Sequence, residues 1–151
     1  MAATTGKIGL GVVIKMGDGA DPEVFTAIAN VADISGPNTT METVDTTHLG
    51  STGGYREFLA HLKDGGEITL TCHFDPNHAT HADDTGLRSK FDGRTLTNFQ
   101  IDMSAAFTTG DNQIDFAAYV TGLGNAFSVD NVIGLDVTLK VSGAVTFSTA
   151  A

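Results

Sequence analysis

The sequence predicts a mainly β fold (α+β overall): an antiparallel β-sandwich or barrel with one flanking α-helix and one long loop. The first observation behind this prediction is that apolar and polar residues alternate in several segments, as in strands with one buried and one solvated face. The second is that eighteen glycines and only three prolines accompany Thr-rich runs, a composition typical of strands joined by tight turns. At 151 residues, the chain is expected to be one domain, 1–151, that buries its own core.

Five segments show the alternation. The clearest is 66–74, where Ile68, Leu70 and Cys72 point to one face, and Thr69 and Thr71 to the other. Each such segment is predicted to be a half-buried strand of an antiparallel sheet. The remaining four are residues 8–15, 98–103, 114–121 and 135–142.

Residues 24–35 fit two structures. Phe25, Ile28, Val31 and Ile34 recur at every third position, as in a helix. The β-branched content and the stop at 35–37 favour a bulged strand, which is the prediction retained. Residues 39–47 follow as a Thr-rich strand with almost no apolar face. This strand has no Lys to protect an open edge, so it is suited to being covered by a partner.

The helix signals lie together after the strand 66–74. Asp75 can cap a helix, Pro76 suits its first turn, and Leu87 and Phe91 share one face before a stop at Asp92. Residues 46–66 look different, with five glycines and at most one helical turn at 55–62. They are predicted to form a loop of about twenty residues, a length that is usually functional or mobile.

Charge excludes one class of function. Eighteen acidic and eight basic residues give a net charge of −10, which argues against gripping nucleic acid but suits a surface past which DNA slides. Only 17% of residues are charged, as expected where a partner covers much of the surface. One cysteine permits no intrachain disulfide. No signal peptide or membrane span is recognised, so folding in a cytosol is expected.

Candidate catalytic chemistry is sparse. His78 and His81 lie three apart on the predicted helix, a spacing that could serve a metal. Cys72 and His73 point to opposite faces of one strand, and Cys72 lies on the apolar face as a small hydrophobe. The prediction is therefore no enzyme, no catalytic residues, no cofactor and no metal site. Two alternatives stay open: a metal-dependent enzyme using His78 and His81, and a monomeric β-sandwich binding module that offers its open edge to a peptide.

Several phrases, taken in order, resemble one family. They begin at 25–37 and continue through 42–49, 54–59, 62–68 and the Asp75-Pro76 pair, and they end with 116–121 and 139–143. In this order they are similar to the siphophage (lambda-like) major tail tube proteins, including those of gene transfer agents. The resemblance covers nearly the whole chain.

The resemblance implies a fold like that of the type VI secretion tube and a structural role in the virion tail. Family members close into hexameric rings that stack into a tube with an acidic channel, through which DNA passes without specific binding. Implied partners are further copies of the chain and the tape measure, tail terminator and baseplate proteins, with no membrane. Assembly in the bacterial host cytoplasm is implied. Some relatives carry an extra immunoglobulin-like domain, which this chain is expected to lack.

Two sets of site residues follow. The family's long loop bridges stacked rings, and residue by residue this implies inter-ring contacts at Glu42, Asp45, Leu49, Tyr55, Arg56 and Phe58. The second set comes from the strand pattern. Asp102 and Asp115 occupy polar strand faces that have no role in the core, so either is expected to line the channel.

Overall fold

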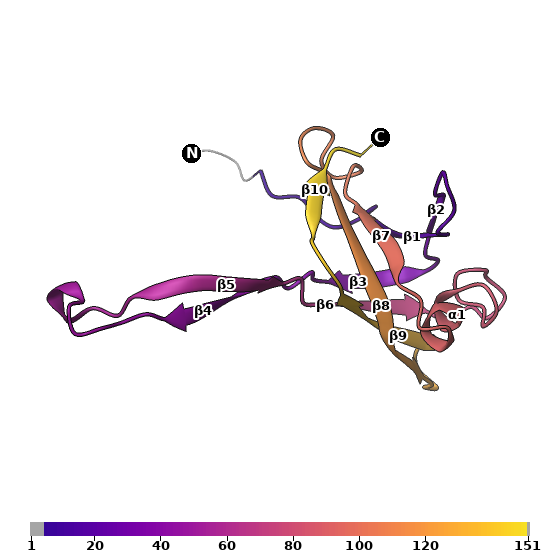
Figure 1. The fold of residues 1–151 in the computed structure, drawn as a ribbon. Coiled ribbons are helices and arrows are strands. Elements are labelled where there is room, and N and C mark those ends of the chain that lie inside the picture. Colours follow the sequence, from indigo (N-terminus) through magenta and orange to yellow (C-terminus); the bar gives the residue numbers. More distant parts are fainter. Residues whose placement is uncertain (1–4, 151) are drawn as a thin grey trace.

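The computed structural model describes residues 5–150, which form ten β-strands, one α-helix and one 3-10 helical turn. Eight strands make one antiparallel sheet in the order β2-β1-β7-β8-β9-β6-β3, with β10 beside β8 (Figure 1). The strands of this sheet are β1 (Val13–Gly17), β2 (Phe25–Ala27), β3 (Val31–Ser35), β6 (Glu67–His73), β7 (Thr97–Asp102), β8 (Gln113–Ala126), β9 (Gly134–Val141) and β10 (Thr146–Ser148). A separate hairpin consists of β4 (Thr40–Asp45) and β5 (Phe58–Asp64), and the helix is α1 (Leu87–Asp92).

The core lies on the apolar face of this sheet, as the alternating pattern predicts. In β6, Ile68, Leu70 and Cys72 are buried while the residues between them are exposed. Phe99 of β7 and Phe116 of β8 stack across the sheet with ring centroids 5.7 Å apart. Burial of such side chains from every central strand provides the main stabilisation of the body. The mainly β, antiparallel class is confirmed.

The sheet curls because its two edge strands are neighbours in the chain. Only residues 28–30 separate β2 from β3, so the two edges lie within a few residues' reach of each other. Backbone hydrogen bonds hold this crossing, from Ile28 N–H to the Ile14 carbonyl and from His73 N–H to the Asn30 carbonyl, each 2.9 Å. The eight strands therefore form a curled, barrel-like body.

Residues 24–35 are strand and not helix, as predicted, but they are two strands. Asn30 has a φ of 56°, a left-handed backbone conformation. The chain changes direction there, between β2 at one edge of the sheet and β3 at the other. The three-residue apolar spacing reflects this turn. A single bulged strand was therefore wrong in detail.

The first strand is shorter than predicted. It begins at Val13, whereas residues 8–12 leave the sheet. Gly11 has a φ of 88°, and the Val12 N–H bonds the Gly9 carbonyl at 3.2 Å, so the chain turns there. Ile8 and Leu10 consequently lie exposed.

The last third of the predicted long loop is a strand. Residues 46–66 contain β5, which pairs with β4 from Thr40↔Asp64 to Asp45↔Phe58. The two strands project from the body as one long hairpin (Figure 1), here called the arm (residues 40–64). The helical turn lies at its tip, at Thr52–Gly54 and not at 55–62. Because both faces of β5 are exposed, its sequence carries no alternation by which to recognise it.

The predicted helix is confined to its last third, α1. Residues 75–86 form successive tight turns, because the Asp75 carboxylate accepts the Asn77 N–H at 3.0 Å and the Leu87 N–H bonds the Thr80 carbonyl at 2.9 Å. Gly86, the residue before α1, lies so close to Thr80 that a Cβ would come 2.3 Å from its carbonyl oxygen. In residues 5–150, no helix has the length and hydropathy that a membrane span requires.

Candidate functional site

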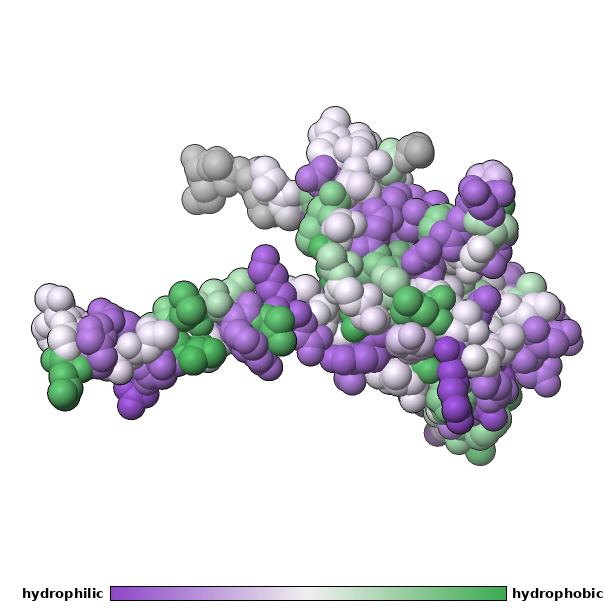
Figure 2. Space-filling view, viewed as in Figure 1, coloured by the Kyte–Doolittle hydropathy of each residue, from purple (hydrophilic) through white to green (hydrophobic). Residues whose placement is uncertain are grey.

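The arm is the feature of the molecule that its own body does not stabilise. All thirteen residues of β4 and β5 are exposed. Large apolar side chains project from it into water, and they appear as green patches along the arm in Figure 2. These side chains are Met41, Val44, Leu49, Tyr55, Phe58, Leu59 and Leu62. So many large apolar side chains exposed on one segment mark a site for a protein partner.

The tip of the arm is held in one conformation by polar contacts. The Ser51 N–H donates to the His48 carbonyl at 3.0 Å, and the Ser51 hydroxyl donates to Glu57 Oε2 at 3.0 Å. The Thr47 hydroxyl accepts the Glu57 N–H at 2.9 Å, which links the two sides of the hairpin. Leu49 stands on this turn fully exposed. A tip already ordered before binding loses less entropy when it docks.

Two pairs of polar side chains face each other across the arm. Arg56 lies 3.7 Å from Asp45, and His61 lies 3.5 Å from Glu42. Hydrogen bonds from the Thr47 hydroxyl and N–H lower the pKa of Asp45. The six residues expected at ring contacts all lie on the arm, and the apolar ones among them, Leu49, Tyr55 and Phe58, are exposed.

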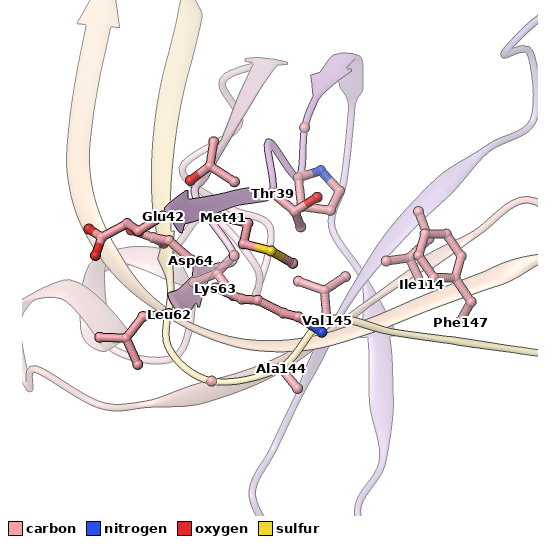
Figure 3. Close-up of a pocket in the computed structure, with 16 residues that line it drawn as sticks. Thr39, Met41, Glu42, Leu62, Lys63, Asp64, Ile114, Ala144, Val145 and Phe147 are labelled. Carbon is pink, nitrogen blue, oxygen red and sulfur yellow. The ribbon is translucent and has the colours of Figure 1, made fainter. Parts of the chain in front are cut away.

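A cleft of about 1000 Å³ lies where the arm joins the body (Figure 3). Met41 and Leu62 of the arm line one part, and Ile114, Val145 and Phe147 of the body line another. The cleft therefore has apolar side chains from both arm and body, alongside the polar Glu42, Lys63 and Asp64 of the arm.

Two contacts set the arm's direction at this base. The Lys140 ammonium lies 3.2 Å from Asp64 Oδ1, joining the end of β5 to β9. The Gly66 N–H donates to the same carboxylate at 2.8 Å, and this bond and then Lys140 lower the pKa of Asp64. Gly66 itself has a φ of 75°, and a Cβ there would lie 2.1 Å from the Asn38 carbonyl oxygen.

The two carboxylates expected in the channel share the polar face of the sheet. Asp102 lies on β7 and Asp115 on β8, and neither is free. Asp102 Oδ2 is 3.0 Å from the Lys15 ammonium, and Asp115 Oδ2 accepts a 2.5 Å hydrogen bond from Ser148. Hydrogen bonds from the Ser104 hydroxyl and N–H, with Lys15 adding its charge, lower the pKa of Asp102.

Other acidic residues on the same face are more open and were missed from sequence. Asp33 of β3 and Asp136 of β9 both pair with Thr71 of β6, the strand between them. The two carboxylates therefore lie on either side of Thr71. Glu67 lies on β6 further along the same face. All three acidic side chains are exposed. Only the strand register, which sequence does not provide, brings them together.

The histidine pair does not share a helix face. His78 Nδ1 lies 2.9 Å from the Thr80 hydroxyl, and the Nδ1 of the buried His81 accepts the Asp75 N–H at 3.1 Å. Desolvation lowers the pKa of His81. Among residues 5–150, no three His, Cys, Asp or Glu side chains are grouped to hold a metal ion. These imidazoles serve the turns before α1.

The family model described as lambda phage tail tube protein matches residues 16–148. The tail of an empty gene transfer agent particle, refined with C6 symmetry, is 23% identical, with a TM-score of 0.70 over 95% of this chain and 100% of that chain.

More distant structures share the fold. The sheath/tube terminator structure of the PVC extracellular contractile injection system contains a chain 14% identical, with a TM-score of 0.71 over 98% of this chain and 100% of that one. The SPP1 tail tube is 11% identical, with a TM-score of 0.67 over 95% and 79%. No curated protein sequence matches the chain.

Proposed function

This chain belongs to the lambda phage tail tube protein family, and on that premise we propose how its copies build the tube. Its role is that of a structural protein of the virion tail. Copies assemble through the arm into stacked rings of six around a channel that DNA crosses. The six-fold number is supported by the C6 symmetry of the gene transfer agent tail, which shares the fold.

The exposed apolar arm is the observation that carries this proposal. A two-stranded hairpin that packs on nothing is marginally stable alone, and its large apolar side chains favour a protein surface over water. Contact with another copy buries Leu49, Tyr55 and Phe58, while Glu42, Asp45 and Arg56 provide polar contacts at the edge. These six residues are the proposed inter-ring contacts.

The polar face of the sheet is the proposed channel wall. Asp102 and Asp115 contribute there, although Lys15 and Ser148 already engage them. Asp33, Glu67 and Asp136 are exposed on the same face and add negative charge. A wall with excess carboxylates repels phosphates, so DNA passes without adhering.

The wider assembly is proposed on the same premise. The tube would meet a tape measure protein inside, and terminator and baseplate proteins at its ends. Two structures with this fold come from a sheath/tube terminator and from the baseplate of the anti-feeding prophage, which supports such end contacts. Assembly would take place in the bacterial host cytoplasm.

Deletion of the arm tests the proposal. Residues 40–64 are replaced by a short Gly-Ser link from Thr39 to Gly65, and a second variant shortens the exposed turn at 108–111 as a control. The armless chain is expected to keep its β circular dichroism and to sediment as a monomer, while the control forms tubes. Tubes of normal length from the armless chain would refute the arm's role.

A further inference from the structure

The body carries a further exposed apolar surface at the loop between β8 and β9, which lies on the side of the body away from the arm (Figure 1). It is formed by residues 127–133, which connect β8 to β9 and are here called the β8–β9 loop. The Phe74 N–H donates to the Ile133 carbonyl at 2.8 Å, which fixes this loop beside the turns before α1. The large apolar side chains exposed on it are Phe127, Val129, Val132 and Ile133. A surface of this kind needs a partner as much as the arm does.

A pocket of about 380 Å³ lies next to this loop, between α1 and the adjoining ends of β8 and β9. Its apolar walls come from Phe74, Leu87, Leu123 and Leu135. Leu123 and Leu135 lie on the strands that lead into and out of the β8–β9 loop, so the pocket is close to the loop along both strands. Its size and apolar lining suit the insertion of an aliphatic side chain.

Both signs of charge lie near the pocket, where Arg88 is 3.5 Å from Asp92 on α1. Three of the chain's eight basic residues, Arg88, Lys90 and Arg94, lie within residues 87–94, and Asp83 and Asp84 lie on the turns that precede α1. The arm also carries both signs, with four carboxylates and two basic residues in 40–64. Two surfaces with apolar centres and mixed charges at their edges can pair with defined orientation.

The tip of the arm provides the matching projection. Leu49 is fully exposed on a turn that Ser51 and Glu57 hold in place. The arm leaves the body on one side, and α1, whose Leu87 and Arg88 line the pocket, lies on the other (Figure 1). When two different surfaces at opposite ends of a molecule bind each other, copies join head to tail and can continue as a stack. Contact between two identical surfaces closes after two copies and forms no stack.

From this arrangement we propose that Leu49, at the arm tip of one copy, inserts into the pocket bounded by Leu87, Leu123 and Leu135 of a copy in the next ring. The β8–β9 loop of that copy covers the arm's apolar side chains. The proposal rests on the proposed ring stacking and names the surface that receives the arm.

Cysteine cross-linking in assembled tubes tests the proposal. The chain carries Leu49→Cys together with Asp83→Cys, an exposed residue that also lines the pocket. The natural Cys72 does not interfere, because it is buried and its burial raises the pKa of its thiol to about 11. Tubes confirmed by negative-stain microscopy are treated with a short bismaleimide. The expected result is loss of the monomer band into a ladder of covalent multimers, while each single variant stays monomeric.

Each outcome separates docking from tube formation. Double-variant tubes that remain monomeric after treatment overturn the docking site and leave the proposed function intact. Dimers from Leu49→Cys alone would mean that tips meet tips, which also overturns it. If Asp83→Cys prevents tube formation, Leu49→Cys with Val129→Cys is the second pair and has the same expected ladder. Failure of the unsubstituted chain to form tubes overturns both docking and the proposed function.

Discussion

Lys140 Nζ lies 3.2 Å from Asp64 Oδ1, which joins the last residue of the arm to a central strand of the body. Both side chains are partly exposed, so this ion pair adds little to the free energy of unfolding. Its effect is on direction, because an arm attached by its two ends alone could swing about its base. The pair therefore bears on assembly more than on folding.

Replacement of Lys140 by Gln should leave thermal unfolding of the monomer nearly unchanged and raise the protein concentration needed for tubes. Sedimentation velocity over a concentration series measures the shift. Lys63→Gln is the matched control, because it removes the same charge from β5, where residues 5–150 show no ion pair for Lys63. An equal shift in both variants would show that net charge, and not arm direction, is responsible.

Core and arm phenylalanines should separate stability from assembly. Phe99→Ala removes a fully buried ring stacked on Phe116 and should destabilise the monomer by about 3–5 kcal/mol. Phe58→Ala removes an exposed ring on the arm and should leave unfolding unchanged while preventing tubes. Urea unfolding and electron microscopy of both variants provide the comparison. A large loss of stability in Phe58→Ala would mean that the arm packs on its own body.

Gly66→Ala should disturb the backbone of the turn that joins β5 of the arm to β6 of the body. The residue has a φ of 75°, and a Cβ would lie 2.1 Å from the Asn38 carbonyl oxygen, so backbone must move. Gly19→Ala is the control, since its φ is 76° but nothing lies within 4 Å of the added Cβ. We expect Gly19→Ala to lower stability by about 1 kcal/mol and Gly66→Ala by clearly more. Equal losses in urea unfolding would contradict the close approach at Gly66.

Asp102 should make the free energy of unfolding fall at acidic pH. Its pKa is lowered below the usual 3.8 in the folded state, so its contribution is complete above pH 3.8 and is lost as the pH falls through the folded value. Asp102→Asn should cost about 1–2 kcal/mol at pH 7, because Lys15 loses its partner. The difference from the unsubstituted chain should persist at pH 5 and narrow below about pH 4. A constant difference across this range would exclude the ion pair as its cause.

Charge reversal on the proposed channel wall should slow DNA passage. Asp136→Lys changes an exposed carboxylate on the polar sheet face, and Asp111→Lys changes an exposed loop carboxylate as the control. Both variants are expected to build tubes, but particles with Asp136→Lys should deliver DNA more slowly, because the added ammonium attracts phosphates. Unchanged delivery kinetics in Asp136→Lys would remove this face from the channel.

The parts of the fold that alternate could be predicted from sequence, because burial on one face leaves a period of two. Residues 66–74 and 135–142 were recognised in this way, and β6 and β9 confirm them. The arm was not, because a strand exposed on both faces selects no apolar side. The sequence pattern therefore predicts β5 as loop, although the resemblance implies an assembly contact at its first residue, Phe58.

The turns before α1 show a different limit. Asp75, Pro76, Leu87 and Phe91 carry the signals of one helix, yet hydrogen bonds within the loop and the close approach of Gly86 to Thr80 divide the segment. These are tertiary contacts that local pattern does not contain. The same holds for Asp33 and Asp136, which only strand register aligns.

Negative-stain electron microscopy of the purified chain at rising concentration tests the central claim most directly. Self-assembly through the arm predicts rings and then stacked tubes with a central channel, from this chain alone. Single particles of monomer size at every concentration, with sedimentation that does not change, would contradict it.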